Sequence, residues 1–251
     1  MLRISFNTHC IGREFLHLRE CDSTNALVMR QLASQDAAEG LLVLADFQTA
    51  GRGQRDARWE AQPGLNLTFT LALFPQIPVE KQFYLNIMAA LAITDTLNQL
   101  PDDVLRIKWP NDIYYHDSKI CGILLQNNLR SNKIHSCALG IGLNVNQLHF
   151  EEGRASSLKK ITGRTYDRIQ LLQQLAEQLE NRYYQLKSGE YGRLKRLYLQ
   201  RLYRMDEWHT FRAAGKQFEG RIVGINEEGQ LAVERNAGLQ FFNYKEITYC
   251  Y

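Results

Sequence analysis

Residues 48–59 bring together side chains that could bind an anion and a flat ring. Arginine offers forked donors suited to phosphate or carboxylate, glycine lets a backbone approach a ligand closely, and an indole provides a flat apolar face. In isolation the segment fits either an anion-binding loop or an exposed loop with solvated arginines. It contains no phosphate-loop motif of the G-x-x-x-x-G-K-[ST] type. Its relevant members are Gln48, Gly51, Arg52, Gly53, Gln54, Arg55, Arg58 and Trp59.

A second group of polar residues lies about fifty residues later, in a segment with the alternation of a β-hairpin. Lys108 and Asp112 flank Trp109-Pro110-Asn111, and Lys119 follows a turn at residues 116–118. Such a turn could bring Lys108, Asp112 and Lys119 to one side of a sheet. Gly122 lies inside an apolar strand, where a ligand or another backbone could pass closely. Each residue alone also fits a solvent-facing hairpin, whereas the whole string favours a site.

Alternating strands and helical segments must position these groups. Residues 14–20, 41–47, 65–74, 104–108, 113–115, 119–129 and 134–145 are typical of strands, and residues 23–34, 80–100 and 167–203 of helices. Either Asp22 or Ser23 could cap the first helix. Asn25 ends the same string of residues and could have only a capping role, without binding a ligand. We therefore predict an α+β domain, a mixed sheet with helices on one face.

The last part of the chain has a different pattern. From His209 onward, short alternating segments are separated by turns at Ala214-Gly215, Glu228-Gly229 and Ala237-Gly238. This pattern predicts a small all-β barrel. We place the boundary near Met205, which gives a catalytic domain over residues 1–204 and a β-barrel domain over residues 205–251.

Composition sets limits on the function. The 251 residues are 45% hydrophobic and 23% charged, the balance of an ordinary globular protein. A net charge of +3 is too small to indicate nucleic-acid binding, and no apolar run approaches the length of a membrane span. The five cysteines are scattered without a C-x-x-C pair, so we expect neither a disulfide scaffold nor a zinc site, and we expect a cytoplasmic protein.

Five motifs resemble those of the biotin–protein ligase family, in the family's order and spacing. The resemblance covers residues 14–160 and extends more weakly to the end of the chain. The Gly-Arg-Gly and Lys-Trp-Pro-Asn-Asp strings are together highly specific. The motifs are Asp22-Ser23-Thr24-Asn25, Gln48-Thr49-Ala50-Gly51-Arg52-Gly53, Lys108-Trp109-Pro110-Asn111-Asp112, Lys119-Ile120-Cys121-Gly122-Ile123-Leu124 and Gly140-Ile141-Gly142-Leu143-Asn144-Val145-Asn146.

The resemblance implies a class II synthetase-like mixed sheet flanked by helices, followed by an SH3-like β-barrel. It also implies a ligase that uses ATP and Mg²⁺ to convert biotin to biotinyl-5′-AMP and then biotinylates a lysine of a biotin carboxyl carrier protein. Some members carry a DNA-binding domain before the first motif. Only about twenty residues precede it here, so we expect no nucleic-acid partner and no repressor function. A homodimer is left open.

The resemblance also suggests roles for individual residues. Lys119 and Arg52 are the candidate catalytic cations, and Asp112 is a candidate ligand for magnesium. The family commonly has a basic residue at position 54 and a glycine at position 56, where this chain has Gln54 and Asp56. Gln54 cannot supply a positive charge for retaining the adenylate, and Arg55 or Arg58 could substitute for it. The expected biotin-binding residues are Ser23, Thr24, Asn25, Gln48, Arg52, Gly53, Gln54, Lys119 and Gly122, and the expected nucleotide-binding residues are Trp59, Lys108, Asn111, Asp112 and Asn144.

Two rival functions compete with biotin ligation. A lipoate or octanoate ligase or transferase of related fold would use a similar sheet. The neutral polar residues Ser23, Thr24 and Gln48 argue against it, because a lipoyl tail favours a more apolar pocket. A nucleic-acid-binding module would use the arginine loop together with the basic segment around Arg193 and Arg196. A solvated helix face explains that segment better.

Overall fold

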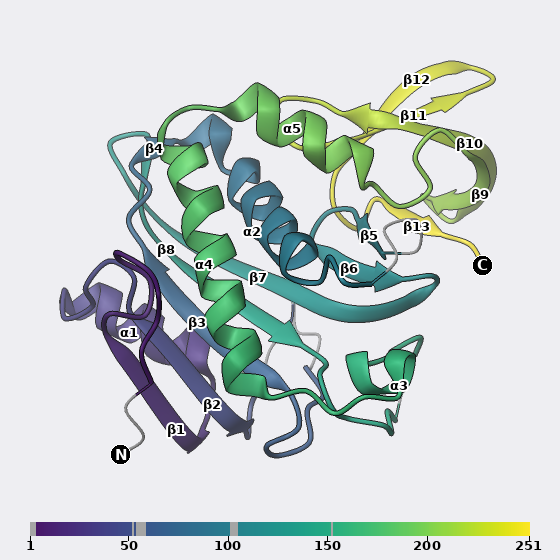
Figure 1. The fold of residues 1–251 in the computed structure, drawn as a ribbon. Helices are drawn as coiled ribbons and strands as arrows, with labels where there is room; N and C mark the ends of the chain where they lie inside the picture. Colours follow the sequence, from purple (N-terminus) through teal and green to yellow (C-terminus); the bar gives the residue numbers. More distant parts are fainter. Residues whose placement is uncertain (1–3, 52, 54–58, 101–104, 152) are drawn as a thin grey trace.

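The larger of two sheets has eight strands. The computed structural model describes residues 4–51, 53, 59–100, 105–151 and 153–251. The strand order is β1-β2-β3-β8-β7-β6-β5, with β4 beside β8 (Figure 1). Strands β1 and β2 are parallel, whereas the other neighbouring strands of the described chain run antiparallel. The strands are β1 (Phe15–Cys21), β2 (Leu42–Gln48), β3 (Leu67–Leu73), β4 (Ile77–Pro78), β5 (Leu105–Lys108), β6 (Asp112–Tyr115), β7 (Ser118–Arg130) and β8 (Lys133–Leu143).

Helices cover both faces of this sheet, so the prediction of helices on one face is wrong. Helix α1 packs with Val28 and Leu32 on Val43, Ala72 and Ala138 of one face. Helices α2 and α4 cover the opposite face. Successive strand residues point to opposite sides of the sheet, so each strand supplies apolar side chains to both faces. None of the helices in the described chain is both long and apolar enough to cross a membrane. The helices are α1 (Thr24–Ser34), the 3₁₀ turn η2 (Val79–Lys81), α2 (Phe83–Thr96), α3 (Leu158–Thr162), α4 (Arg168–Lys187) and α5 (Tyr191–Gln200).

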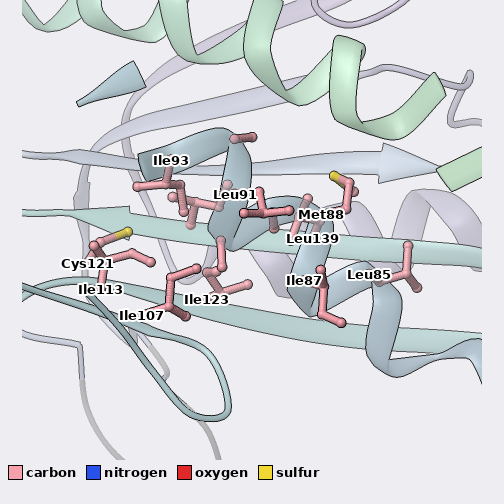
Figure 2. Packing of buried hydrophobic residues seen from close by; sticks show 14 of the residues in the cluster. Leu85, Ile87, Met88, Leu91, Ile93, Ile107, Ile113, Cys121, Ile123 and Leu139 are labelled. Carbon is pink, nitrogen blue, oxygen red and sulfur yellow. The ribbon is translucent and has the colours of Figure 1, made fainter. Parts of the chain in front are cut away.

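Helix α2 forms the centre of the main core. It is apolar around most of its circumference, because the sheet, α4 and α5 surround it. Figure 2 shows its Leu85, Ile87, Met88, Leu91 and Ile93 beside apolar residues of β5–β8. Strands β5, β6 and β7, which carry Lys108, Asp112 and Lys119, therefore pack on a buried helix. The strand partners labelled in the figure are Ile107, Ile113, Cys121, Ile123 and Leu139.

The C-terminal region forms a second, antiparallel sheet of five strands in the order β12-β11-β10-β9-β13. It fits an SH3-like domain, although the described strands form an open sheet and no pairing closes it into a barrel. The division into residues 1–204 and 205–251 stays a prediction. The strands are β9 (Trp208–Ala213), β10 (Lys216–Ile225), β11 (Leu231–Arg235), β12 (Gly238–Phe242) and β13 (Ile247–Tyr249).

The turn before β11 and the linker after α5 join the C-terminal sheet to the rest of the chain. The Trp109 indole donates a hydrogen bond to the Gly229 carbonyl at 2.8 Å. Gly229 has a φ of +84°, and a side chain there would overlap Phe83 of η2–α2. Leu202, in the linker after α5, forms a parallel β-bridge with Ile107 of β5. A motif tryptophan therefore links the hairpin directly to the C-terminal sheet.

A buried carboxylate fastens the N-terminal segment to α4. Glu180 accepts backbone hydrogen bonds from His9 (2.7 Å), Cys10 (2.7 Å) and Ile11 (3.0 Å). Burial alone would raise the pKa of Glu180, but these three N–H donors outweigh it and hold the pKa below its ordinary value.

We expect Glu180→Gln to reduce the free energy of unfolding by about 1–3 kcal/mol at pH 7, because an amide cannot accept all three bonds. The depressed pKa makes this stabilisation fully present above the unfolded-state pKa, and it is lost as the pH falls through the folded-state value. Urea unfolding at pH 7 and at acidic pH measures both effects. The partly exposed Glu177 of the same helix supplies the control, Glu177→Gln. A deficit that persists unchanged in acid would contradict the linkage.

Candidate active site

One cavity crosses strands β3, β8 and β7, from the start of α1 to the Asn111–Asp112 turn. Polar groups line both ends, and glycines line the middle. It brings together ten of the residues that the sequence singled out, namely Ser23, Thr24, Asn25, Gln48, Gly53, Trp59, Asn111, Asp112, Lys119 and Gly122. Arg52 and Gln54 lie outside the described residues.

The α1 end of the cavity is neutral and rich in hydrogen-bonding groups. Ser23 is the N-cap, its hydroxyl accepting from the Ala26 N–H at 3.4 Å. Gln48 Oε1 accepts from both the backbone N–H (2.7 Å) and the hydroxyl (3.0 Å) of Thr24. Asn25 is buried, and its Oδ1 has no hydrogen-bond partner among the described residues. This end can hold an uncharged ligand group that both donates and accepts.

Glycines form the floor of the cavity and admit a tryptophan ring. A Cβ at Gly142 would overlap the Trp59 indole, and one at Gly122 would lie 3.2 Å from the same ring. A Cβ at Gly140 would lie 2.9 Å from the Asn25 amide nitrogen. Glycine at these three positions therefore allows close approach of both an aromatic ring and a ligand.

The other end of the cavity carries an ion pair. Lys119 Nζ lies 2.7 Å from Asp112 Oδ1, and both side chains are partly exposed, at 33% and 25%. The Lys119 ammonium is 5.9 Å from the centroid of the Trp59 ring. Two backbone hydrogen bonds fix the position of Lys119: its N–H donates to the Arg154 carbonyl, and its carbonyl accepts from the Ser156 backbone N–H. A positioned cation thus lies between the neutral end and the surface.

Two buried asparagines stabilise the turns that surround this ion pair. The Asn111 side chain donates through Nδ2 to the Ile123 carbonyl, and its backbone carbonyl accepts the Ile123 N–H at 3.2 Å, so both parts of Asn111 support the turn. Asn144 donates to the Ser156 carbonyl at 3.0 Å, and its Oδ1 has no partner among the described residues. Asn144 and Lys108 do not line the cavity.

A buried amide fixes the segment that follows Trp59. Gln147, fully buried, accepts from the Gln62 N–H (2.9 Å) and from Asn66 Nδ2 (2.6 Å). Its Nε2 lies 3.3 Å from a Glu60 carboxylate oxygen. The backbone N–H of Trp59 also donates to the Gly51 carbonyl at 3.1 Å. These bonds hold the ring over the glycine floor.

Sequence reasoning missed several residues that line the cavity, among them Thr68, Thr70 and Tyr244. Thr68 and Thr70 alternate with apolar residues along β3, and this period-two pattern was the available signal. The Thr70 hydroxyl lies 2.9 Å from that of Thr24. Tyr244 comes from the turn between β12 and β13 of the second sheet. No local pattern marks Tyr244, because only the packing of the two sheets brings it to the cavity.

Comparisons with known proteins agree with this geometry. A model of the Biotin/lipoate A/B protein ligase family matches residues 18–144. The bifunctional ligase/repressor BirA of Bacillus subtilis is 31% identical over 95% of this chain and 75% of its own length. The biotin–[acetyl-CoA-carboxylase] ligase of Paracoccus denitrificans is 30% identical over 92% of this chain and 99% of its own length. The structure of biotin protein ligase from Aquifex aeolicus in complex with biotin and ATP is similar with a TM-score of 0.77, at 26% identity, over 94% of this chain and 98% of that one.

Proposed function

The chain belongs to the Biotin/lipoate A/B protein ligase family, and we propose that it activates biotin with ATP and transfers the biotinyl group to a lysine of a carrier protein. The observation that carries this proposal is the polarity of the cavity. A neutral hydrogen-bonding end faces a charged end with Lys119 and Asp112 across a floor of glycines. Biotin has the same polarity, with an uncharged ureido ring at one end and a carboxylate at the other.

The neutral end suits the ureido ring. Thr24, Asn25 and Gln48 offer donors and acceptors without a net charge. Asn25 Oδ1, which has no partner among the residues that the structure describes, needs a donor that a ureido N–H would supply. Ser23 completes this wall from the helix cap. Gly140 and Gly122 of the glycine floor would let the apolar part of biotin lie against the sheet.

The charged end suits the first chemical step. A biotin carboxylate oxygen attacks the α-phosphorus of ATP, and the bond to the bridging oxygen breaks to release pyrophosphate. Both reactants are anionic, so a fixed cation that approaches both lowers the barrier. Lys119 is the proposed cation, and Arg52, outside the described residues, is the second. Gly53 and Gln54 of the same loop would contact biotin, although Gln54 supplies no charge.

We assign the nucleotide to the side of the cavity that Trp59 covers. The indole offers a face for adenine, and Asn144 and Asn111 lie on the neighbouring turns. Lys108 would lie near the phosphates. In the second step the acceptor lysine amine attacks the biotinyl carbonyl, an amide bond forms and AMP leaves.

Asp112 could hold magnesium together with the nucleotide phosphates. One of its oxygens contacts Lys119, and the described residues contain no cluster of three or more His, Cys, Asp or Glu that could hold a metal. One carboxylate plus phosphate oxygens is the usual way proteins bind Mg²⁺, so the donor set fits. Bound there, the ion would neutralise charge on the phosphates.

The proposed acceptor is a biotin carboxyl carrier protein. The relatives named biotin–[acetyl-CoA-carboxylase] ligase support this acceptor class. We propose a cytoplasmic protein, since all five cysteines are free. Neither nucleic-acid binding nor a particular oligomeric state forms part of the proposal.

Biotin-dependent exchange of labelled pyrophosphate into ATP, with magnesium, tests the activation step. We expect exchange with biotin and none with lipoate, because lipoate lacks the ureido groups that Thr24 and Gln48 would bind. Lipoate is assayed separately in place of biotin, because the matched family is that of biotin and lipoate protein ligases. Exchange with lipoate alone would assign the chain to that branch, and exchange with neither acid would refute the proposed activity. Transfer is then measured with a purified carrier domain and a variant of it that lacks the acceptor lysine.

A further inference from the structure

The ammonium of Lys108 lies among three tyrosine rings. Its Nζ is 4.7 Å from the ring centroid of Tyr114, 4.8 Å from that of Tyr249 and 5.4 Å from that of Tyr251. It also donates a hydrogen bond to the Tyr114 hydroxyl at 3.1 Å. Each distance is within the range of a cation–π contact. We call Tyr114, Tyr249 and Tyr251 the tyrosine cage.

Two members of the cage come from the C-terminal sheet region. Tyr249 ends β13, and Tyr251 follows two residues later, whereas Tyr114 lies on β6 of the main sheet. Tyr249 is buried, and its hydroxyl has no hydrogen-bond partner among the described residues. Tyr249 contributes its ring to the cage, with the ring centroid 4.8 Å from the Lys108 ammonium. Phe211 holds that ring at 5.3 Å in an edge-on contact.

Two further cations lie close to the ring of Tyr251. The guanidinium carbon of Arg154 lies 3.9 Å from the centroid of its ring, and that of Arg204 lies 5.1 Å away. Arg204 also faces Asp117 at 3.6 Å. Lys108, Arg154 and Arg204 repel one another, and the electron-rich ring offsets part of this repulsion. The ring is half-exposed, so solvent or a ligand can reach the cluster.

The cage lies next to the charged end of the cavity. Lys108 pairs with Asp112 across β5 and β6, and opposed residues of an antiparallel pair face the same side of the sheet. Asp112 in turn contacts Lys119 at 2.7 Å. Lys108, Asp112 and Lys119 thus occupy three neighbouring strands, β5, β6 and β7.

We propose that Tyr249 and Tyr251 are positioning residues, which together with Tyr114 hold the Lys108 ammonium beside Asp112 for the nucleotide phosphates. The proposal rests on the proposed function for its consequence in catalysis. Through these rings the C-terminal sheet contributes to nucleotide binding without itself supplying a charge. The neutral end of the cavity lies at β2 and β3, and strands β8 and β7 separate it from Lys108 and Tyr114 of β5 and β6, so we expect the effect to fall on ATP.

Replacement of Tyr251 tests this role through kinetics. We expect Tyr251→Leu to raise the KM for ATP about three- to tenfold in pyrophosphate exchange and to leave the KM for biotin unchanged, whereas Tyr251→Phe keeps the ring and stays within about twofold of the wild type. Phe241→Leu is the matched control, an exposed aromatic residue on β12 of the same sheet. Equal changes in both KM values, or an unchanged KM for ATP, would overturn the proposal.

A second measurement tests the cage without activity. Reductive methylation with ¹³C-formaldehyde labels lysine amines, and Lys108→Arg identifies the Lys108 resonance. We expect the ring currents of the cage to displace this resonance in the wild type, and Tyr251→Leu and Tyr249→Leu to reduce the displacement. An undisplaced wild-type resonance refutes the cage. Should the wild type show no pyrophosphate exchange, the proposed function fails, and the resonance still decides whether the cage exists.

Discussion

Replacement of Lys119 by alanine is expected to slow biotin-dependent adenylate formation by on the order of 10²–10³, because it removes one preorganised charge donor from the reacting centre. Lys119 lies between the neutral end of the cavity and Asp112, where a biotin carboxylate and an α-phosphate would meet. A water molecule in the space left by the side chain would carry no charge and could not replace this cation. Single-turnover formation of the adenylate measures the effect free of product release.

Three controls separate charge from packing. Lys119→Gln keeps most of the side-chain length without the charge, and we expect it to lose nearly as much rate as Lys119→Ala. Lys133→Ala removes an exposed lysine from β8 and should leave the rate unchanged. The thermal unfolding midpoint should move little, because a partly exposed ion pair contributes at most about 1 kcal/mol. A loss of less than a fewfold would remove Lys119 from the proposed catalytic role.

Much of the site follows from local sequence, since local rules govern its parts. The N-cap at Ser23, the hairpin of β6 and β7, and the glycines on β7 and β8 each depend on residues a few positions apart. The neutral residues Thr24 and Gln48 meet where the neighbouring parallel strands β1 and β2 end. Polar residues on a buried strand face also predict a pocket, although the threonines of β3 were missed.

The remainder depends on contacts between distant segments. The parallel pairing of β1 and β2 places α1 on the face opposite to α2, and nothing in either strand alone indicates which face a helix will cover. Tyr244 reaches the cavity, and Tyr251 reaches Lys108, because long-range contacts such as the one between Trp109 and Gly229 join the C-terminal sheet to the rest of the chain. An aromatic residue near the end of a small sheet is otherwise read as core. Interactions across a domain junction have no signal in a local pattern.

The Trp59 position yields the second large expected effect. We predict that Gly142→Ala raises the KM for ATP at least about tenfold, the scale of losing one base–aromatic stack. The added methyl group would overlap the indole ring, which must then leave the floor of the cavity. Trp59 itself is held in place, because its backbone N–H donates to the Gly51 carbonyl and the neighbouring Glu60 accepts a hydrogen bond from Gln147. Titration of ATP at saturating biotin measures the change.

A double-mutant cycle identifies the route by which Gly142 acts. Trp59→Ala alone should also raise the KM for ATP, and adding Gly142→Ala to it should have little further effect, because the ring that the methyl group displaces is gone. Gly192→Ala is the control for a glycine change, since α5 leaves open space around that position. Additive losses in the double variant, or a raised KM for biotin in Gly142→Ala, would mean instead that the Gly142 backbone contacts biotin directly. The stacking role of Trp59 would then need separate evidence, because the glycine floor alone would account for the loss.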